Sequence, residues 1–251
     1  MVELQVAVAK VPRHGAEESG DTLEMIERPG GGLSVVLVDG QGSGRGAKTL
    51  SNLIATRAIA QLKDGARDGV VARAVHDYLY TYRMGQVAAT LNILSVDLRS
   101  GTVLVSRNNP APFFIIEDGQ VHSQSDPSMP IGLHPGTKPR ITEIPLRPNL
   151  YVVVFTDGLL KAGQRFGEDL ELVNFLAGWP VEDGAPPLAE ALLARALEAD
   201  HGEPADDISV VVLAALPKPT IGRVRRMWVS QPIEHLAANG RREIGTDEDL
   251  G

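Results

Sequence analysis

The chain has 251 residues, 43% of them hydrophobic, and a formal net charge of -8, so it can bury a core but offers no basic surface for nucleic acid. It contains no cysteine, which excludes disulfides, thiolate zinc sites and iron–sulfur clusters. It also lacks an N-terminal apolar leader and any run of about 20 apolar residues, so we expect a cytoplasmic protein that does not enter a membrane.

The first third of the chain predicts three strands and then two helices. Apolar residues alternate with polar ones at the start, and a turn at Pro29–Gly32 separates two further β-branched runs. Apolar residues then recur at helical spacing. We expect strands at 2–9, 23–28 and 33–38 and helices at 47–62 and 69–83.

The remainder predicts strands in tandem, with two helices before the last strand. The stretch 90–123 is predicted to be a β-meander, because short alternating runs are joined by Gly-containing turns. We expect strands at 90–98, 102–107, 113–117, 120–123, 140–146, 150–156 and 208–214, with helices near 168–177 and 187–199. Helices in tandem followed by strands in tandem indicate an α+β fold rather than alternating βαβ units.

The composition changes at Pro217. Residues 217–251 are highly charged and have few apolar residues in any period. This predicts one domain over 1–216 and a mostly disordered tail over 217–251, with a short helix near 232–239.

Three apolar runs meet acidic residues at their ends. Asp39-Gly40 and Asp157-Gly158 each follow a strand, and Asp206-Asp207 precedes one. A carboxylate at the end of a buried strand is costly unless something compensates its charge. Because the three acidic sites lie far apart in sequence, they predict one shared cation.

Oxygen ligands of this kind suit magnesium and manganese. Asp21 adds a fourth carboxylate from the strand expected to pair with 33–38, and Gly40 allows the backbone to come close enough for its carbonyl to act as a ligand. Two such ions, about 3.5–4 Å apart, support an in-line displacement and make hydroxide available near neutral pH.

Five motifs in order resemble one family. The sequence reads Ser-Gly-Asp at 19–21, Val-Asp-Gly-Gln-Gly-Ser-Gly at 38–44, Ala-Thr-Leu at 89–91, Phe-Thr-Asp-Gly at 155–158 and Asp-Asp-Ile-Ser-Val-Val-Val at 206–212. As a set these resemble the metal-dependent (PPM or PP2C-like) protein phosphatases. They are most similar to the bacterial sporulation stage II E type, which includes phosphatases of stress-response partner switching. The resemblance implies two stacked antiparallel β-sheets flanked by helices.

The resemblance also implies a site. Two Mn2+ or Mg2+ ions would both contact Asp39, which with Asp157 would be catalytic. Gly40 would lend its carbonyl, Asp21 would hold one ion, and Asp157 and Asp206 would hold the other. The sequence does not decide whether Asp206 or its neighbour Asp207 takes this role. Asn109 and Gln41 are expected to support the site without binding metal.

The sequence departs from the family pattern in places. The usual Ala-Gly-His-Pro is replaced by Arg107–Pro112, and Gln41 stands where some relatives have histidine. Arg13 is the only nearby candidate for a phosphate-binding arginine. The general acid and the phosphate clamp are therefore not identified.

The activity implied is hydrolysis of phosphoserine or phosphothreonine by direct attack of metal-bound hydroxide. The expected substrate is a phosphorylated regulatory protein, such as an anti-sigma antagonist or a stress-sensor component. The sequence leaves the oligomeric state open.

Two other classes compete with this interpretation. Gly42–Thr49 follows a strand and opens a helix, so it resembles a P-loop or a dinucleotide turn, although Ala47 replaces the second P-loop glycine. The predicted β-meander disfavours that nucleotide-binding alternative. The other class is an interaction module without catalysis, which the retained acids disfavour.

Overall fold

The computed structural model describes residues 1–218, 224–227 and 229–230. The chain divides into a compact unit, Met1–Pro219, and a second unit, Thr220–Gly251. The predicted helix near 232–239 and most of the predicted disordered tail lie outside the described residues, so both stay predictions.

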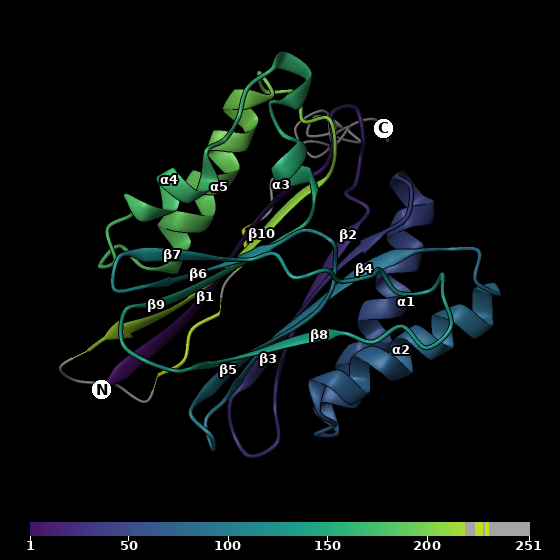
Figure 1. The fold of residues 1–251 in the computed structure, drawn as a ribbon, viewed down its shortest axis with the longest axis horizontal. Helices are drawn as coiled ribbons and strands as arrows, with labels where there is room; N and C mark the ends of the chain where they lie inside the picture. Colours follow the sequence, from purple (N-terminus) through teal and green to yellow (C-terminus); the bar gives the residue numbers. More distant parts are fainter. Residues whose placement is uncertain (219–223, 228, 231–251) are drawn as a thin grey trace, which may run out of the picture. The chain divides into compact units, whose positions relative to one another are not determined.

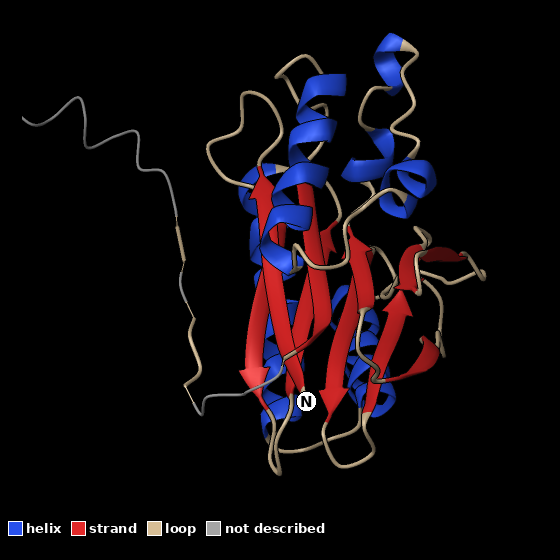
Figure 2. Ribbon diagram, turned by 90° about the vertical axis from the view of Figure 1, so that its left-hand side faces the viewer, coloured by secondary structure: helices blue, strands red, loops and turns tan. Residues whose placement is uncertain are grey.

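Two five-stranded antiparallel sheets face each other (Figures 1 and 2). The strands of sheet I are, in spatial order, β1 (Val2–Val11), β10 (Ile208–Pro217), β9 (Leu150–Phe155), β6 (Phe113–Glu117) and β7 (Gln120–Gln124). Those of sheet II are β2 (Asp21–Glu27), β3 (Leu33–Gly40), β4 (Ala89–Asp97), β5 (Thr102–Asn108) and β8 (Arg140–Pro145).

Helices cover the outer face of each sheet (Figure 1). Sheet II is covered by α1 (Gly44–Lys63) and α2 (Asp68–Arg83), and sheet I by α3 (Gly158–Lys161), α4 (Leu172–Ala177) and α5 (Ala185–Ala199). A 3₁₀ turn at Gln164–Phe166 follows α3. This arrangement confirms the predicted α-β-β-α sandwich.

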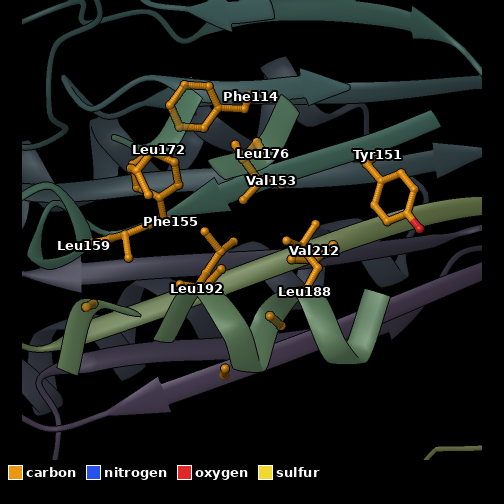
Figure 3. Packing of buried hydrophobic residues seen from close by; sticks show 14 of the residues in the cluster. Phe114, Tyr151, Val153, Phe155, Leu159, Leu172, Leu176, Leu188, Leu192 and Val212 are labelled. Atoms are coloured by element: carbon orange, nitrogen blue, oxygen red, sulfur yellow. The ribbon is translucent and has the colours of Figure 1, made fainter. Parts of the chain in front are cut away.

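Alternation along the strands produces three apolar layers. One face of β3 places Val35 and Leu37 between the sheets, and the other places Val36 and Val38 against α1 and α2. On the far side, α5 packs Leu188 and Leu192 against sheet I (Figure 3). Strands buried on both faces explain why the sequence shows continuous apolar runs rather than strict alternation.

The structure corrects the prediction in the middle of the chain. The stretch 90–123 is not one meander, because β4 and β5 pair in sheet II while β6 and β7 pair in sheet I. The chain crosses between the sheets at Asn109–Pro112, and two prolines there interrupt strand pairing. The helix α3 was not predicted, because four residues give no readable periodicity.

The topology also decides against the nucleotide-binding alternative. Every strand pairing in both sheets is antiparallel, whereas P-loop and dinucleotide folds need a parallel sheet. Over the described part of the chain, none of the helices combines the length and apolarity needed to cross a membrane.

Candidate active site

The apolar layer between the sheets ends in polar side chains at one edge. Every second residue of four strands points into the layer between the sheets. On each of these strands the next such position, beyond the last apolar residue, holds a polar side chain. These are Asp21 before Leu23, Asp39 after Leu37, Thr156 after Val154 and Ser209 before Val211. At these inward positions, sheet I thus contributes hydroxyl groups and sheet II contributes carboxylates.

Asp21 is buried at this edge and is oriented by the opposite sheet. Its Oδ2 accepts hydrogen bonds from Thr156 Oγ1 at 3.0 Å and from Ser209 Oγ at 2.6 Å. Its Oδ1 is equally buried and has no hydrogen-bond partner. Burial raises the pKa of Asp21 to about 6, although the two hydroxyl bonds oppose the shift.

Asp39 lies directly opposite Asp21 in the β2–β3 ladder. Burial raises the pKa of Asp39 to about 8, and the negative charges of Asp21, Asp157 and Asp206 contribute to this shift. These four acids therefore form one electrostatic group, here called the acid cluster. A cluster of acids whose negative charge is balanced by so few positive groups is typical of a cation-binding site.

Asp157 and Asp206 already share a cation, which is the ammonium group of Lys161. Lys161 Nζ lies 2.7 Å from Asp157 Oδ2 and 2.7 Å from Asp206 Oδ2. Burial alone would lower the pKa of Lys161, but its hydrogen bonds to Asp157 and Asp206 outweigh this and raise it. The lysine belongs to α3, one helical turn after Asp157.

Asp207 has a different role from its neighbour. Its Oδ1 accepts from the backbone N–H of Arg13 at 3.0 Å, and its Oδ2 accepts from that of Gly20 at 2.9 Å. Both carboxylate oxygens are thus used to hold the segment that leads into Asp21. The geometry therefore favours Asp206 over Asp207 as the member of the acid cluster.

The two glycines that follow the site aspartates are required by close packing. A Cβ on Gly40 would lie 2.4 Å from the carbonyl oxygen of Ala47 in α1, and one on Gly158 would lie 2.1 Å from that of Asp207. Neither backbone oxygen can move freely, so only glycine fits at these positions. This reason differs from the predicted one, which was access of the Gly40 carbonyl to a metal.

Asn109 supports the strand that carries Asp157. It is buried, and its Nδ2 donates to the carbonyl of Phe155 at 3.3 Å while its Oδ1 accepts from Ala111 N–H at 2.9 Å. It therefore ties the crossover between the sheets to the end of β9. Gln41 is exposed and exchanges two hydrogen bonds with Ala88, so it anchors the turn after β3 to the start of β4.

Two lysines converge on the backbone beside the acid cluster. Lys10 Nζ and Lys48 Nζ lie 2.6 Å and 2.7 Å from the carbonyl oxygen of Asp21. Burial, with the nearby charge of Lys48, lowers the pKa of Lys10 to about 8. Lys48 and Thr49 are the last two residues of the P-loop-like motif, and both side chains have hydrogen-bond partners within the chain. Lys48 contacts the carbonyl of Asp21, and Thr49 Oγ1 donates to the carbonyl of Arg45.

The acid cluster fits a divalent ion in its chemistry, although its carboxylates lie apart from one another. Among the described residues, no three His, Asp or Glu side chains are arranged closely enough to hold a metal. The buried Oδ1 of Asp21 nevertheless lacks a partner, and an ammonium group occupies a cation position between Asp157 and Asp206. The donors are all oxygen atoms, which suits magnesium or manganese.

Sequence reasoning did not find Thr156, Ser209, Lys161, Lys10 and Lys48. Thr156 and Ser209 occupy inward positions at their strand ends, so counting the alternation past the apolar residues finds both. Lys161 requires knowing that a helical turn follows Asp157. The lysines at 10 and 48 contact a backbone carbonyl, and sequence carries no signal for such a contact.

Comparison with known proteins places the chain in a family. No curated protein matches its sequence significantly. The PP2C phosphatase domain of SpoIIE from Bacillus subtilis, solved with a fragment of its regulatory domain, superposes with a TM-score of 0.77 and 21% identity. That match covers 87% of this chain and 65% of the other, so this chain spans just under two thirds of the length of that structure.

Two further solved structures share the fold. The RsbU and RsbW domains of a Mycobacterium tuberculosis protein match with a TM-score of 0.69 and 19% identity, over 86% of this chain and 61% of that one. RsbX in complex with magnesium matches with a TM-score of 0.64 and 15% identity, over 86% and 98%. The family model for stage II sporulation protein E matches residues 29–215. The chain therefore belongs to the SpoIIE family and has a PP2C-type phosphatase fold.

Proposed function

We propose that this protein is a metal-dependent protein serine/threonine phosphatase that uses two Mn2+ or Mg2+ ions. The observation that carries the proposal is the acid cluster, in which both sheets place Asp21, Asp39, Asp157 and Asp206 at one edge of the sandwich. Packing of the core gives no reason for four acids at this edge, because a buried carboxylate is costly and Oδ1 of Asp21 has no hydrogen-bond partner.

The residues divide between the two ions. Asp39 would contact both, because it interacts with the acids on either side of it. Asp21 and the Gly40 carbonyl would hold one ion, and Asp157 with Asp206 would hold the other. When bound, the ions would supply Lewis acidity toward the phosphoryl oxygens and make hydroxide available near neutral pH.

The surrounding residues position these ligands. Thr156 and Ser209 hold one oxygen of Asp21, which leaves Oδ1 available. Asp207 fixes the segment that precedes Asp21 through backbone N–H groups. Such outer contacts usually change metal affinity or activity by about 10–100-fold when they are removed.

The substrate is proposed to be a phosphoserine or phosphothreonine on a bacterial regulatory protein. Family membership supports this, as does the open, half-exposed position of Asp157 and Asp206 at the protein surface, with side chains 40% and 33% exposed. A protein segment can approach an open site of this kind, whereas a small metabolite usually needs an enclosing pocket.

The test is manganese-dependent hydrolysis of p-nitrophenyl phosphate, followed by release of phosphate from candidate phosphoproteins. We expect turnover of both, and no binding of ATP in a parallel calorimetric titration. A protein that binds ATP and hydrolyses neither phosphate ester would overturn the proposal. Binding of a partner protein without hydrolysis would instead support a non-catalytic interaction module.

A further inference from the structure

The two halves of the acid cluster are occupied differently. On the side of Asp157 and Asp206, the ammonium group of Lys161 lies within 2.7 Å of an oxygen of each carboxylate. On the other side, Oδ1 of Asp21 is buried without any hydrogen-bond partner. The lysines near Asp21 contact its backbone carbonyl rather than its carboxylate.

The position of Lys161 follows from α3. Asp157 is the N-cap of this helix and Lys161 is its last residue, so the two side chains are separated by one turn on the same face. Asp206 reaches the same ammonium group from the segment before β10. One monovalent cation therefore stands where the proposed function requires two carboxylates to hold a divalent ion.

The ion pairs of Lys161 with Asp157 and Asp206 can be broken and replaced by contacts with water or with a metal ion. The side chains of Lys161, Asp157 and Asp206 are 46%, 40% and 33% exposed, so water reaches all three. An ion pair in such surroundings contributes little net stability, and the released ammonium group can be hydrated without movement of the core. A divalent ion carries twice the charge of the lysine and attracts the same oxygens more strongly.

We propose that Lys161 competes with the ion at Asp157 and Asp206, so that this ion binds only by displacing the ammonium group. This inference rests on the proposed function for the identity of the ligands. It implies ordered loading, in which the ion at Asp21 and Asp39 binds first and more tightly. The ion displacing Lys161 binds second and more weakly.

The test is calorimetric titration of the full, metal-stripped chain with Mn2+, supported by electron paramagnetic resonance of free Mn2+. Wild type is expected to show a tight and a weak class of site. Lys161→Met keeps the length of the side chain without its charge, and it should tighten the weak class on the order of tenfold, since two half-exposed ion pairs no longer have to be broken. The tight class should not change.

Two controls separate displacement from a general change of charge. Lys161→Arg keeps the positive charge and should leave the weak class weak. Lys63→Met removes the same charge at the far end of α1, about 28 Å along the helix from Gly44, and should reproduce wild type. If Lys161→Met leaves the weak class unchanged or weakens it, or if wild type shows only one class of site, the inference is wrong.

Thermal unfolding gives a second readout that does not depend on activity. Without metal, Lys161→Met should unfold at a slightly lower temperature than wild type, because Asp157 and Asp206 lose their shared cation and each half-exposed pair contributes only a little stability. With saturating Mn2+ the difference should disappear, since the ion displaces Lys161 in wild type and neither protein then has ion pairs between residue 161 and the two carboxylates. An equal loss of stability with and without Mn2+ would indicate a purely structural lysine. Failure of the phosphatase assay alone would leave these binding results intact.

Discussion

Asp21 and Asp39 occupy opposite positions on adjacent antiparallel strands, and both side chains face the gap between the sheets. Side chains at such positions have Cβ atoms about 4.5–5.5 Å apart, and like charges placed there destabilise a sheet. The pair therefore makes the folded, metal-free protein less stable than its apolar core alone would allow. A cation is the simplest way to remove that penalty.

Replacing Asp39 with asparagine tests this relationship. Asp39→Asn should abolish phosphatase activity, by more than about a hundredfold, because outer contacts alone are commonly worth about 10–100-fold. The metal-free variant should be more stable than metal-free wild type. The folded pKa of Asp39, about 8, lies above its ordinary value of 3.8, so wild type loses stability as pH rises between these values.

The measurement is urea unfolding of both proteins in EDTA from pH 4 to pH 8. The stability advantage of Asp39→Asn should be smallest near pH 4 and grow toward pH 8. An advantage that does not depend on pH would show that the carboxylate charge is not its cause. Near-normal turnover of the variant at low millimolar Mn2+ would refute the proposed bridging role.

Metal identity follows from the ligand set. All proposed ligands are oxygen atoms, so Mn2+ or Mg2+ should activate the enzyme and Zn2+ should not be required. Exhaustive treatment with EDTA should stop hydrolysis of p-nitrophenyl phosphate, and added Mn2+ should restore it. Persistent activity after chelation, verified by elemental analysis, would exclude the mechanism.

Close packing at Gly158 predicts a large effect for a single methyl group. A Cβ there would lie 2.1 Å from the carbonyl oxygen of Asp207, so Gly158→Ala must displace the segment that carries Asp206. We expect a loss of about 1–3 kcal/mol in the free energy of unfolding, as is usual for overpacking, and a larger relative loss of activity.

Gly46→Ala is the matched control for this substitution. Gly46 lies in α1, and a Cβ there would have no heavy atom within 4 Å. Alanine should stabilise the helix by up to about 1 kcal/mol. Equal effects of the two substitutions would show that the contact with Asp207 does not matter.

His76 gives the protein a dependence on acid that is separate from the acid cluster. The ring is buried in α2, and backbone N–H groups of Gly132 and Thr137 point at Nδ1 and Nε2, at 3.1 and 3.3 Å. Burial lowers the pKa of His76, although Asp77 opposes the shift; the neutral ring can accept one of these two bonds, and a protonated ring can accept neither.

Because this pKa is depressed in the folded state, the stability that depends on it is present above the ordinary value of 6.5 and is lost as pH falls. Wild type should therefore lose stability relative to His76→Gln below about pH 6.5, by at most about 1.4 kcal/mol per pH unit for one proton. Parallel unfolding curves from pH 7.5 to pH 5 measure the difference. A constant difference would mean that the ring does not titrate there.

The end of the compact unit predicts the effect of truncation. Lys218 N–H donates to the carbonyl of Met1, and Lys218 Nζ pairs with Glu3 at 3.0 Å, so the cut should follow Lys218 rather than Leu216. Deleting residues 219–251 should leave folding and hydrolysis of p-nitrophenyl phosphate nearly unchanged. Any loss should appear with a protein substrate, since the arginines at 223, 225 and 226 can attract an acidic partner. A melting temperature lower by several degrees, with parallel loss of small-substrate activity, would contradict this expectation.

Much of the fold was readable from periodicity. The strands ending at Asp39 and Asp157 are short apolar runs bounded by Asp-Gly, and the structure places them as β3 and β9. What the sequence could not supply was the sheet to which each strand belongs. The crossover after Asn109 transfers the chain from one sheet to the other, and no local pattern distinguishes it from an ordinary hairpin.

The clustering of the four acids was predictable from the sequence, but the contacts that support them were not. The four acids stand out in the sequence because a carboxylate at the end of a buried strand is energetically costly unless its charge is balanced. They are Asp21, Asp39, Asp157 and Asp206. Lys161 and Ser209 do not stand out, since a surface lysine and a serine in a strand are ordinary in sequence. Their roles arise from tertiary neighbours, Asp206 for one and Asp21 for the other.

The hydrogen bond from Ser209 to Asp21 joins residues near opposite ends of the compact unit. Its donor lies on β10, the last strand of that unit to be synthesised, and β10 also pairs with β1, the first. During translation, β1 therefore cannot pair with β10 until almost the whole domain has been synthesised. The acid cluster is consequently assembled late, after both sheets have met, and a growing chain cannot acquire the complete ligand set before β10 has emerged.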